Sequence, residues 1–144
     1  MENKELKLDL GCGRNKREGY VGVDADSGVG ADIVASALDL PFEDESVDEV
    51  HSSHLVEHFD PSDAQKFFDE VFRVLKKGKT AYIKVDRDWT SKRLLRKNPE
   101  HKYRYTEDEI RAMVRKFSKA EVKNRIYFIN FYTPRNKIFV HLEK

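Results

Sequence analysis

Two glycines and an aspartate near the start of the chain have the spacing of a ligand-binding turn. Gly11 and Gly13 directly follow the β-rich run Leu6–Leu10, and a second β-rich run ends at Asp24. Glycine permits backbone angles and close ligand approach that a side chain would block. Ligands of open α/β sheets bind just beyond the carboxyl ends of the strands, where a carboxylate can accept hydrogen bonds from both hydroxyls of a ribose. The pattern predicts a nucleoside site, although a Gly-x-Gly by itself is common in loops.

The connection between these two runs is unusually short. Nine residues separate Leu10 from Tyr20, whereas a parallel crossover normally takes a dozen or more residues and carries a helix. Nicotinamide dinucleotides place their pyrophosphate at a helix N-terminus. The short turn therefore argues against such a cofactor.

Three histidines, His51, His54 and His58, lie in the segment HSSHLVEHF. Since an unperturbed imidazole titrates near neutrality, His54 or His58 could accept a proton during catalysis. Packing or capping near a helix start is the alternative for both, and His51, within a β-rich run, is interpreted as structural. We expect no metal, because a strand and a helix start need not bring their histidines together. Cys12, the one cysteine, is expected to pack in the glycine turn rather than act as a nucleophile.

Basic and aromatic side chains alternate in the segment DRDWTSKRLLRKNPEHKYRYTEDE. Cations interleaved with aromatics suit phosphates and stacked bases, so RNA, DNA or a phosphorylated small molecule is the expected substrate class. A solvated basic helix is the alternative. The substrate-side candidates are Arg87, Trp89, Arg93, His101 and Tyr105.

The elements that must position these residues follow from turn and capping signals. Further β-rich runs cover Asp32–Ala35, Asp48–Ser53 and Lys79–Asp86. A helix is expected from the N-cap Asp60 to the basic and glycine residues at Lys76–Gly78, and Thr106 with Glu109 has capping-box spacing. The runs Glu121–Phe131 and Lys137–Leu142 predict an antiparallel pair at the sheet edge.

These elements predict an α/β fold, with a mostly parallel Rossmann-like sheet, an antiparallel C-terminal edge pair and helices reduced on one face. Ala81, Ile83 and Val85 alternate with Tyr82 and Lys84, which strands buried on both faces would not do. One face should therefore be semi-polar or covered by a second subunit, and we expect a homodimer.

The segments LDLGCG, VGVDAD, LDLPFEDESVDEVHSSHLVEHF and EVFRVLKKGKTAYIKV follow one another over about Leu6–Val85. In this order they resemble the class I S-adenosylmethionine-dependent methyltransferases, especially the small type 11 group. The segment HKYRYTEDEI also looks like the one before that family's late helix. Asn15 stands where the family often has a third glycine, and the long helix that follows there is missing.

The resemblance implies S-adenosylmethionine as cofactor and a role for each matching residue. Asp9, Gly11, Cys12 and Gly13 would line the methionine moiety, Asp24 would bind the ribose, and Ala25 would lie against the adenine. Asp39 would meet the adenine amino group, with Leu40 beside the ring. Ser53 and His54 would border the sulfonium and the substrate entrance.

Charge is divided unevenly along the 144 residues. Residues 1–75 carry 7 Lys/Arg against 18 Asp/Glu, and residues 76–144 carry 20 against 8. This split favours either an anionic partner of the basic half or mutual neutralisation of the two halves. We expect one domain, with residues 1–86 as the cofactor-binding half and residues 87–144 as the basic substrate side and hairpin. The charged start and single cysteine favour a cytoplasmic protein.

The sequence thus predicts S-adenosylmethionine-dependent methyl transfer, by direct displacement, to an unidentified anionic or nucleic-acid acceptor. The alternative is a non-catalytic scaffold of the same fold that binds nucleic acid or a protein through its basic half.

Overall fold

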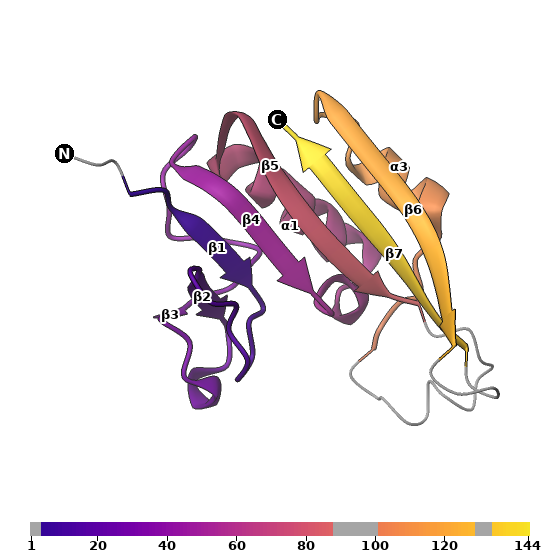
Figure 1. Cartoon of the computed structure of the whole chain (residues 1–144), viewed down its shortest axis with the longest axis horizontal. Coiled ribbons are helices and arrows are strands. Elements are labelled where there is room, and N and C mark those ends of the chain that lie inside the picture. Colours follow the sequence, from indigo (N-terminus) through magenta and orange to yellow (C-terminus); the bar gives the residue numbers. More distant parts are fainter. Residues whose placement is uncertain (1–3, 88–100, 129–133) are drawn as a thin grey trace.

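The chain forms one seven-stranded sheet in the order β3-β2-β1-β4-β5-β7-β6 (Figure 1). A computed structural model describes residues 4–87, 101–128 and 134–144. The strands are β1 (Lys7–Leu10), β2 (Val21–Asp24), β3 (Ile33–Val34), β4 (Val47–Ser53), β5 (Leu75–Asp86), β6 (Lys119–Phe128) and β7 (Pro134–Glu143). The first five pair in parallel, whereas β7 is antiparallel to both β5 and β6. This arrangement confirms the predicted fold class.

Helices cover only one face of the sheet. In Figure 1 the helices α1 (Pro61–Val74) and α3 (Glu107–Met113) both lie behind the sheet, and its near face carries no helix of the described residues. Two short 3-10 turns, η1 (Ser27–Val29) and η2 (Val56–His58), lie in the loops after β2 and β4. Within the described ranges, no helix is long and apolar enough to cross a membrane.

Alternation along the strands explains how one face can stay without helices. Ala81, Ile83 and Val85 of β5 are buried in the same core as the α1 side chains, while Tyr82 keeps 45% of its surface exposed on the other face. The reduction of helices on one face, predicted from this alternation, is confirmed. We call the helix-free side the bare face.

Helix α1 begins as predicted but ends earlier. The Asp60 carboxylate accepts a hydrogen bond from the Asp63 amide at 2.9 Å, and Pro61 occupies the first turn. Leu75, however, already pairs with Val47 as the first residue of β5, so the basic residues and glycine that follow belong to a strand. Gly78, with a φ of 73°, donates its amide to the Lys144 carbonyl at 2.8 Å. This glycine therefore shapes the start of β5 instead of ending the helix.

Helix α3 begins with the predicted capping box. The Glu109 amide donates to the Thr106 hydroxyl at 3.2 Å, and the Thr106 amide donates to the Glu109 carboxylate at 2.8 Å. Both ends of this pair satisfy amides that the first helical turn leaves without intrahelical partners.

Arg73, near the end of α1, ties down the loop between β3 and β4. Its guanidinium donates to the carbonyls of Leu40 and Phe42 at 3.0 and 2.8 Å, and to the Asp44 carboxylate at 2.9 Å. Glu70 accepts from Arg73 at 2.7 Å and from the Leu40 amide at 2.7 Å. The hydrogen bond from Arg73 is the main reason that the pKa of Glu70 lies below its usual value. The pair thereby fixes the loop that carries Asp39.

Replacing Arg73 should destabilise the fold measurably. We expect Arg73→Ala to lower the free energy of unfolding by about 2 kcal/mol, since several charge-assisted hydrogen bonds are lost at once. Because the pKa of folded Glu70 is lowered, its stabilisation is present above the usual value of 4.5 and is lost as pH falls below it. Urea unfolding at pH 7 and near pH 3.5 should show the effect of Arg73→Ala shrinking in acid.

The matched control is Lys66→Ala, which removes an exposed ion pair to Asp63 on the same helix. Exposed pairs of this kind contribute little. An equal loss of stability in both variants would contradict the role given to Arg73.

Candidate active site

The turn after β1 is built around two glycines with left-handed backbone angles. Gly11 and Gly13 have φ values of 67° and 55°. A Cβ on Gly11 would lie 2.9 Å from the Leu55 side chain, whereas a Cβ on Gly13 would meet no atom within 4 Å. Glycine at position 11 thus lets β1 and Leu55 approach, and Gly13 faces open space that a ligand can use.

Asp24, at the carboxyl end of β2, is held by two backbone amides. Gly13 donates its N–H to Oδ2 and Asp26 donates to Oδ1, both at 2.9 Å. A carboxylate offers about four lone-pair positions, so both oxygens can still accept a further hydrogen bond. The glycine turn therefore orients the two Asp24 oxygens next to the open space at Gly13.

A groove runs past this carboxylate at the carboxyl ends of β1, β2 and β3. It is lined by Gly11, Val23, Asp24, Ala25, Ala35, Ser36, Ala37, Leu55 and Phe59. The lining is apolar apart from the Asp24 carboxylate and Ser36, and it contains no side chain that could bind a pyrophosphate. The donor set fits a nucleoside whose ribose meets Asp24 and whose base lies against small apolar residues.

The two residues predicted to meet the adenine lie differently. Asp39 is exposed in the turn after β3, and its amide donates to the Ser36 carbonyl at 3.2 Å, which places it next to the groove. Leu40 is only 3% exposed and belongs to the core. Its position beneath the loop differs from the ring-facing position expected from the sequence.

Asp9 and Cys12 are both buried, and both contact protein groups. One Asp9 oxygen accepts from the Arg17 amide at 2.9 Å, and the other lies 3.0 Å from Nδ1 of His51. Burial, together with the charges of Asp24 and Asp9, raises the pKa of the Cys12 thiol. A thiol held protonated is a poor nucleophile, which supports the interpretation of Cys12 as a packing residue.

His54 follows Ser53, the last residue of β4, in a strained backbone conformation. Its φ of 58° lies in the left-handed region that non-glycine residues seldom adopt. Its amide donates to the Lys84 carbonyl at 3.0 Å, and this turn directs Nδ1 toward Glu57 and Asp86, at 3.4 and 3.7 Å from their carboxylate oxygens. The strand end thus presents an imidazole to two acids.

These acids change the titration of His54. Asp86 first, and Glu57 second, raise the pKa of His54 to about 9, against the opposing effects of burial and of Lys137. Nε2 lies 3.0 Å from the Lys137 ammonium. Burial raises the pKa of Asp86, but the hydrogen bond and charge of His54 outweigh it, so that the pKa of Asp86 is lowered. The two acids thus favour the protonated form of His54, and Lys137 opposes it.

His58 and His101 come together although 42 residues separate them. Their rings pack edge to face, with centroids 5.1 Å apart and planes at 90°. The amides of Lys102 and Tyr103 donate to the Glu57 carbonyl at 2.9 and 3.2 Å, which docks the segment from His101 onward against η2. The sequence predicted a role for each histidine but not their contact.

Glu57 is a functional candidate that sequence reasoning missed. It is 1% exposed, and neither of its carboxylate oxygens has a hydrogen-bond partner among the described residues; Asp86 Oδ1 is in the same situation. The available signal was an acid placed between apolar residues and two histidines in HLVEHF. The burial of Glu57 is not what a solvated helix start would give.

The substrate-side candidates are only partly described. Arg87 is half-buried, and its amide donates to the Asn136 carbonyl at 2.8 Å; Trp89 and Arg93 lie outside the described residues. Tyr105 is fully buried and donates its hydroxyl to the Phe59 carbonyl at 2.6 Å. It supports the loop after η2 from the core side, in contrast to the substrate contact expected from the sequence.

Solved structures share this architecture at low sequence identity. A Haemonchus contortus phosphoethanolamine N-methyltransferase 2, in complex with phosphomonomethylethanolamine and S-adenosylhomocysteine, superposes with a TM-score of 0.79 at 18% identity. The match covers 100% of this chain but only 49% of that one, so the chain spans about half the length of this relative. An S-adenosylmethionine-dependent methyltransferase from Archaeoglobus fulgidus superposes with a TM-score of 0.78 at 16% identity, covering 99% of this chain and 87% of that one.

A third similar structure is a Haloferax volcanii putative methyltransferase in complex with the Trm112 methyltransferase activator. Its TM-score is 0.73 at 18% identity, with 99% of this chain and 84% of that one covered. These likenesses establish the fold. Among curated proteins, none matches the sequence significantly.

The sequence, rather than the fold, shows to which family the chain belongs. Residues 8–83 match the family described as Methyltransferase domain, of type 11. The matched region is more than half of the 144 residues and includes the glycine turn, Asp24 and the segment with the three histidines. The chain therefore belongs to the Methyltransferase domain family, whose members are class I S-adenosylmethionine-dependent methyltransferases.

Proposed function

We propose that this chain transfers the methyl group of S-adenosylmethionine to an anionic acceptor. The observation that carries the proposal is the Asp24 carboxylate, which the Gly13 and Asp26 amides hold at the edge of a groove of ribose-and-base character. Since both oxygens can still accept a hydrogen bond beside the groove, this geometry favours binding of a ribose.

Each part of the groove has a task in this proposal. Asp24 binds the ribose hydroxyls, Ala25 and Asp39 border the adenine, and the turn at Gly11–Gly13 borders the methionine part. When bound, S-adenosylmethionine supplies an electrophilic methyl group, whose bond to sulfur breaks as the acceptor atom attacks it. Leu55 and Phe59, which line the groove from the loop after β4, exclude water and help to align the reactants.

His54 and His58 are the proposed groups for handling the acceptor's proton. A base must be neutral, and the raised pKa makes neutral His54 the major form only above about pH 9. Below that pH, His54 instead offers positive charge and an N–H at the end of β4. His58 is half-buried beside His101 and completes the same edge of the site.

Substitution of Asp24 tests the cofactor site. We expect Asp24→Ala to abolish binding of S-adenosylmethionine and S-adenosylhomocysteine in calorimetric titration, with NAD as a ligand that should not bind the unmodified protein either. Asp108→Ala is the control, because the Asp108 side chain is 93% exposed on α3. Unchanged affinity in Asp24→Ala would refute the placement of the ribose.

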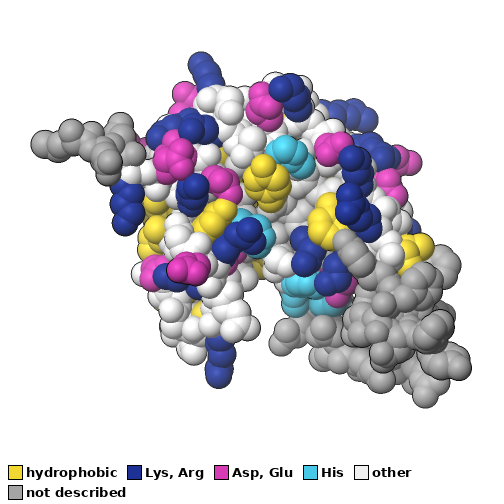
Figure 2. Space-filling view, in the orientation of Figure 1, with side chains coloured by type: hydrophobic (Ala, Val, Ile, Leu, Met, Phe, Trp, Pro, Cys, Tyr) yellow, Lys and Arg dark blue, Asp and Glu magenta, His cyan; other side chains and the backbone are white. Residues whose placement is uncertain are grey.

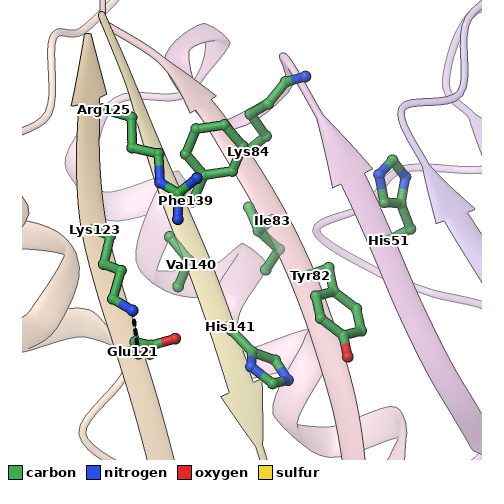
Figure 3. A pocket seen from close by; sticks show the side chains of 10 residues that line it. All are labelled: His51, Tyr82, Ile83, Lys84, Glu121, Lys123, Arg125, Phe139, Val140 and His141. Carbon is green, nitrogen blue, oxygen red and sulfur yellow. Dashed lines mark ion pairs between the residues drawn. The ribbon is translucent and has the colours of Figure 1, made fainter.

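The bare face suggests which acceptor class the chain uses. This face has a hollow of about 300 Å³. Figure 3 shows the side chains of β4, β5, β7 and β6 that line it. Tyr82 stacks on His141 with ring centroids 4.4 Å apart and planes 10° from parallel. In the next row of the sheet, the Phe139 ring makes cation–π contacts with two side chains. The Lys84 ammonium lies 5.9 Å and the Arg125 guanidinium 5.7 Å from its ring centroid. Exposed rings beside cations suit stacked bases and phosphates.

Basic side chains lie on the two rows of this face that are nearest the active site. Register pairs Ser53 with Lys84, Lys84 with Phe139, and Phe139 with Lys123, and one row further on Lys137 with Arg125. Figure 2 shows Lys and Arg side chains gathered over the β5–β6 side of the face. Lys137 also lies 3.0 Å from His54. We therefore infer that single-stranded nucleic acid crosses the bare face with one end at the catalytic edge.

Removing the exposed ring and the nearby charge tests this acceptor class. We expect Tyr82→Ala to weaken binding of a fluorescent single-stranded RNA by at least about fivefold, since a stacked base contributes about 1–3 kcal/mol, and Arg125→Ala to weaken it as well. In anisotropy titrations at several salt concentrations, Arg125→Ala should also flatten the dependence of affinity on salt. Lys66→Ala, on the helix-covered side of the sheet, should change neither quantity.

Equal RNA affinity in Tyr82→Ala, Arg125→Ala and the unmodified protein would exclude this face. A phosphorylated small molecule is then the acceptor to screen, as the bound phosphomonomethylethanolamine of the Haemonchus contortus structure suggests.

The alternative proposal is that a second copy of the chain covers the bare face, which would make the protein a homodimer. A two-fold contact would place the face against its own copy, so that Lys84 and Arg125 of both copies would be brought into one interface. This electrostatic conflict favours an anionic ligand over a second copy. Sedimentation velocity at low and high protein concentration separates the two cases, because a dimer must appear at high concentration if the face mediates self-association.

The non-catalytic scaffold is the competing function. Its supporting observation is the same basic face, which needs no cofactor to bind nucleic acid. Saturable cofactor binding without methylation of any RNA or phosphorylated acceptor would favour the scaffold.

A further inference from the structure

We propose that Glu57, His58 and His101 form a binding site for one divalent transition-metal ion. Each residue offers one donor atom, and the three donors lie within 4.8 Å of one another. Two donors around a tetrahedral zinc ion, at about 2.0–2.2 Å from it, are about 3.3–3.6 Å apart, so the donors here are at most about 1.5 Å further apart than in a bound site. Small side-chain rotations would therefore bring all three onto one ion.

The burial of Glu57 points to a missing cation. Its side chain is 1% exposed, and both carboxylate oxygens lack a hydrogen-bond partner among the described residues. Buried carboxylates are normally paired, hydrogen-bonded or bound to a metal. His54 Nδ1 lies 3.4 Å from Oε1 without forming a hydrogen bond, and Asp86 adds a second acid near the same place. Both Glu57 oxygens and Asp86 Oδ1 thus accept no hydrogen bond from the described residues, and a metal ion could bind such oxygens.

Backbone contacts hold the three donors in place before any ion arrives. Glu57 and His58 are consecutive residues of η2, and the Glu57 carbonyl accepts the Lys102 and Tyr103 amides at 2.9 and 3.2 Å. These bonds place His101 beside His58, with the two rings perpendicular. The buried Tyr105 hydroxyl anchors the same segment through the Phe59 carbonyl at 2.6 Å. Such fixed ligand positions are what a metal site requires.

The donor types indicate the class of ion. Two imidazoles and one carboxylate form the ligand set of many catalytic zinc sites, which leave a further position open. Mg²⁺ prefers oxygen ligands, so this set should discriminate against it. Leu55 and Phe59, on either side of η2, both line the groove beside Asp24, so an oxygen of an acceptor could occupy the open position. The site itself does not depend on the proposed methyl transfer.

Metal titration of tag-free, chelator-treated protein tests the proposal. Calorimetry with ZnCl₂ should show one equivalent bound by the unmodified protein and at least tenfold weaker binding by Glu57→Gln and by His101→Ala. MgCl₂ should bind at least tenfold more weakly than ZnCl₂. His141→Ala is the matched control. This exposed histidine stacks on Tyr82 and is not one of the three proposed ligands.

Thermal unfolding supplies a second readout that separates a metal ligand from a structural acid. Without metal, Glu57→Gln should melt at the same temperature as the unmodified protein or higher, because it removes a buried carboxylate that accepts no hydrogen bond from the described residues and has the His54 imidazole 3.4 Å away. With Zn²⁺, only the unmodified protein and His141→Ala should gain thermal stability. The proposal is overturned if the unmodified protein binds no Zn²⁺, if Glu57→Gln and His101→Ala bind it equally well, or if Glu57→Gln melts several degrees lower without metal.

Discussion

The connections that follow β1 and β2 are too short to carry helices, and the rest of the architecture depends on that constraint. With no helices to cover it, one face of the sheet must tolerate water, which is why Tyr82 and Lys84 alternate with buried neighbours in β5. The turn after β1 must also be stabilised without helix packing. Asp9 does this by accepting the Arg17 amide at 2.9 Å, and Asp24 by accepting the Gly13 amide at 2.9 Å. Acids of the candidate site therefore also hold the backbone around it.

At the ends of β4 and β5, the candidate site contains several charged groups close together. His54, Glu57 and Asp86 lie together where β4 and β5 end, with Lys137 adjacent to His54. Groups of this kind are costly to bury unless each is compensated. The left-handed backbone at His54 indicates that the arrangement is maintained against local strain. Strain combined with buried, perturbed titratable groups is typical of functional sites.

Local signals in the sequence were sufficient for much of the fold. The cap at Asp60, the capping box at Thr106 and Glu109, and the alternation in β5 each depend on neighbouring residues, and each appears in the structure. The end of α1 was mispredicted, because Leu75 fits a helical apolar stripe as well as it fits a strand paired with Val47. Propensity cannot distinguish the two when the deciding partner is 28 residues away.

The site residues of the glycine turn could be predicted from the sequence, whereas those brought together by contacts between distant segments could not. Gly11, Gly13 and Asp24 could be assigned because spacing along two short strands fixes their geometry. The meeting of His58 with His101, and the burial of Tyr105, depend on a segment that returns to η2 from over 40 residues away. The burial of Glu57 beside this segment is indicated only by its apolar neighbours in HLVEHF, a local signal too general to identify the carboxylate as a site residue.

The position of β7 has a consequence for how the sheet assembles. Although it comes last in the chain, β7 lies between β5 and β6, and β6 has no other strand partner in the described sheet. During synthesis β6 therefore cannot join the sheet until β7 has emerged, whereas α3 also contacts α1, for example where Gln65 donates to the Met113 carbonyl at 3.1 Å. Pairings between segments far apart in sequence form slowly. Loss of the final strand would therefore remove β6 from the sheet as well as β7.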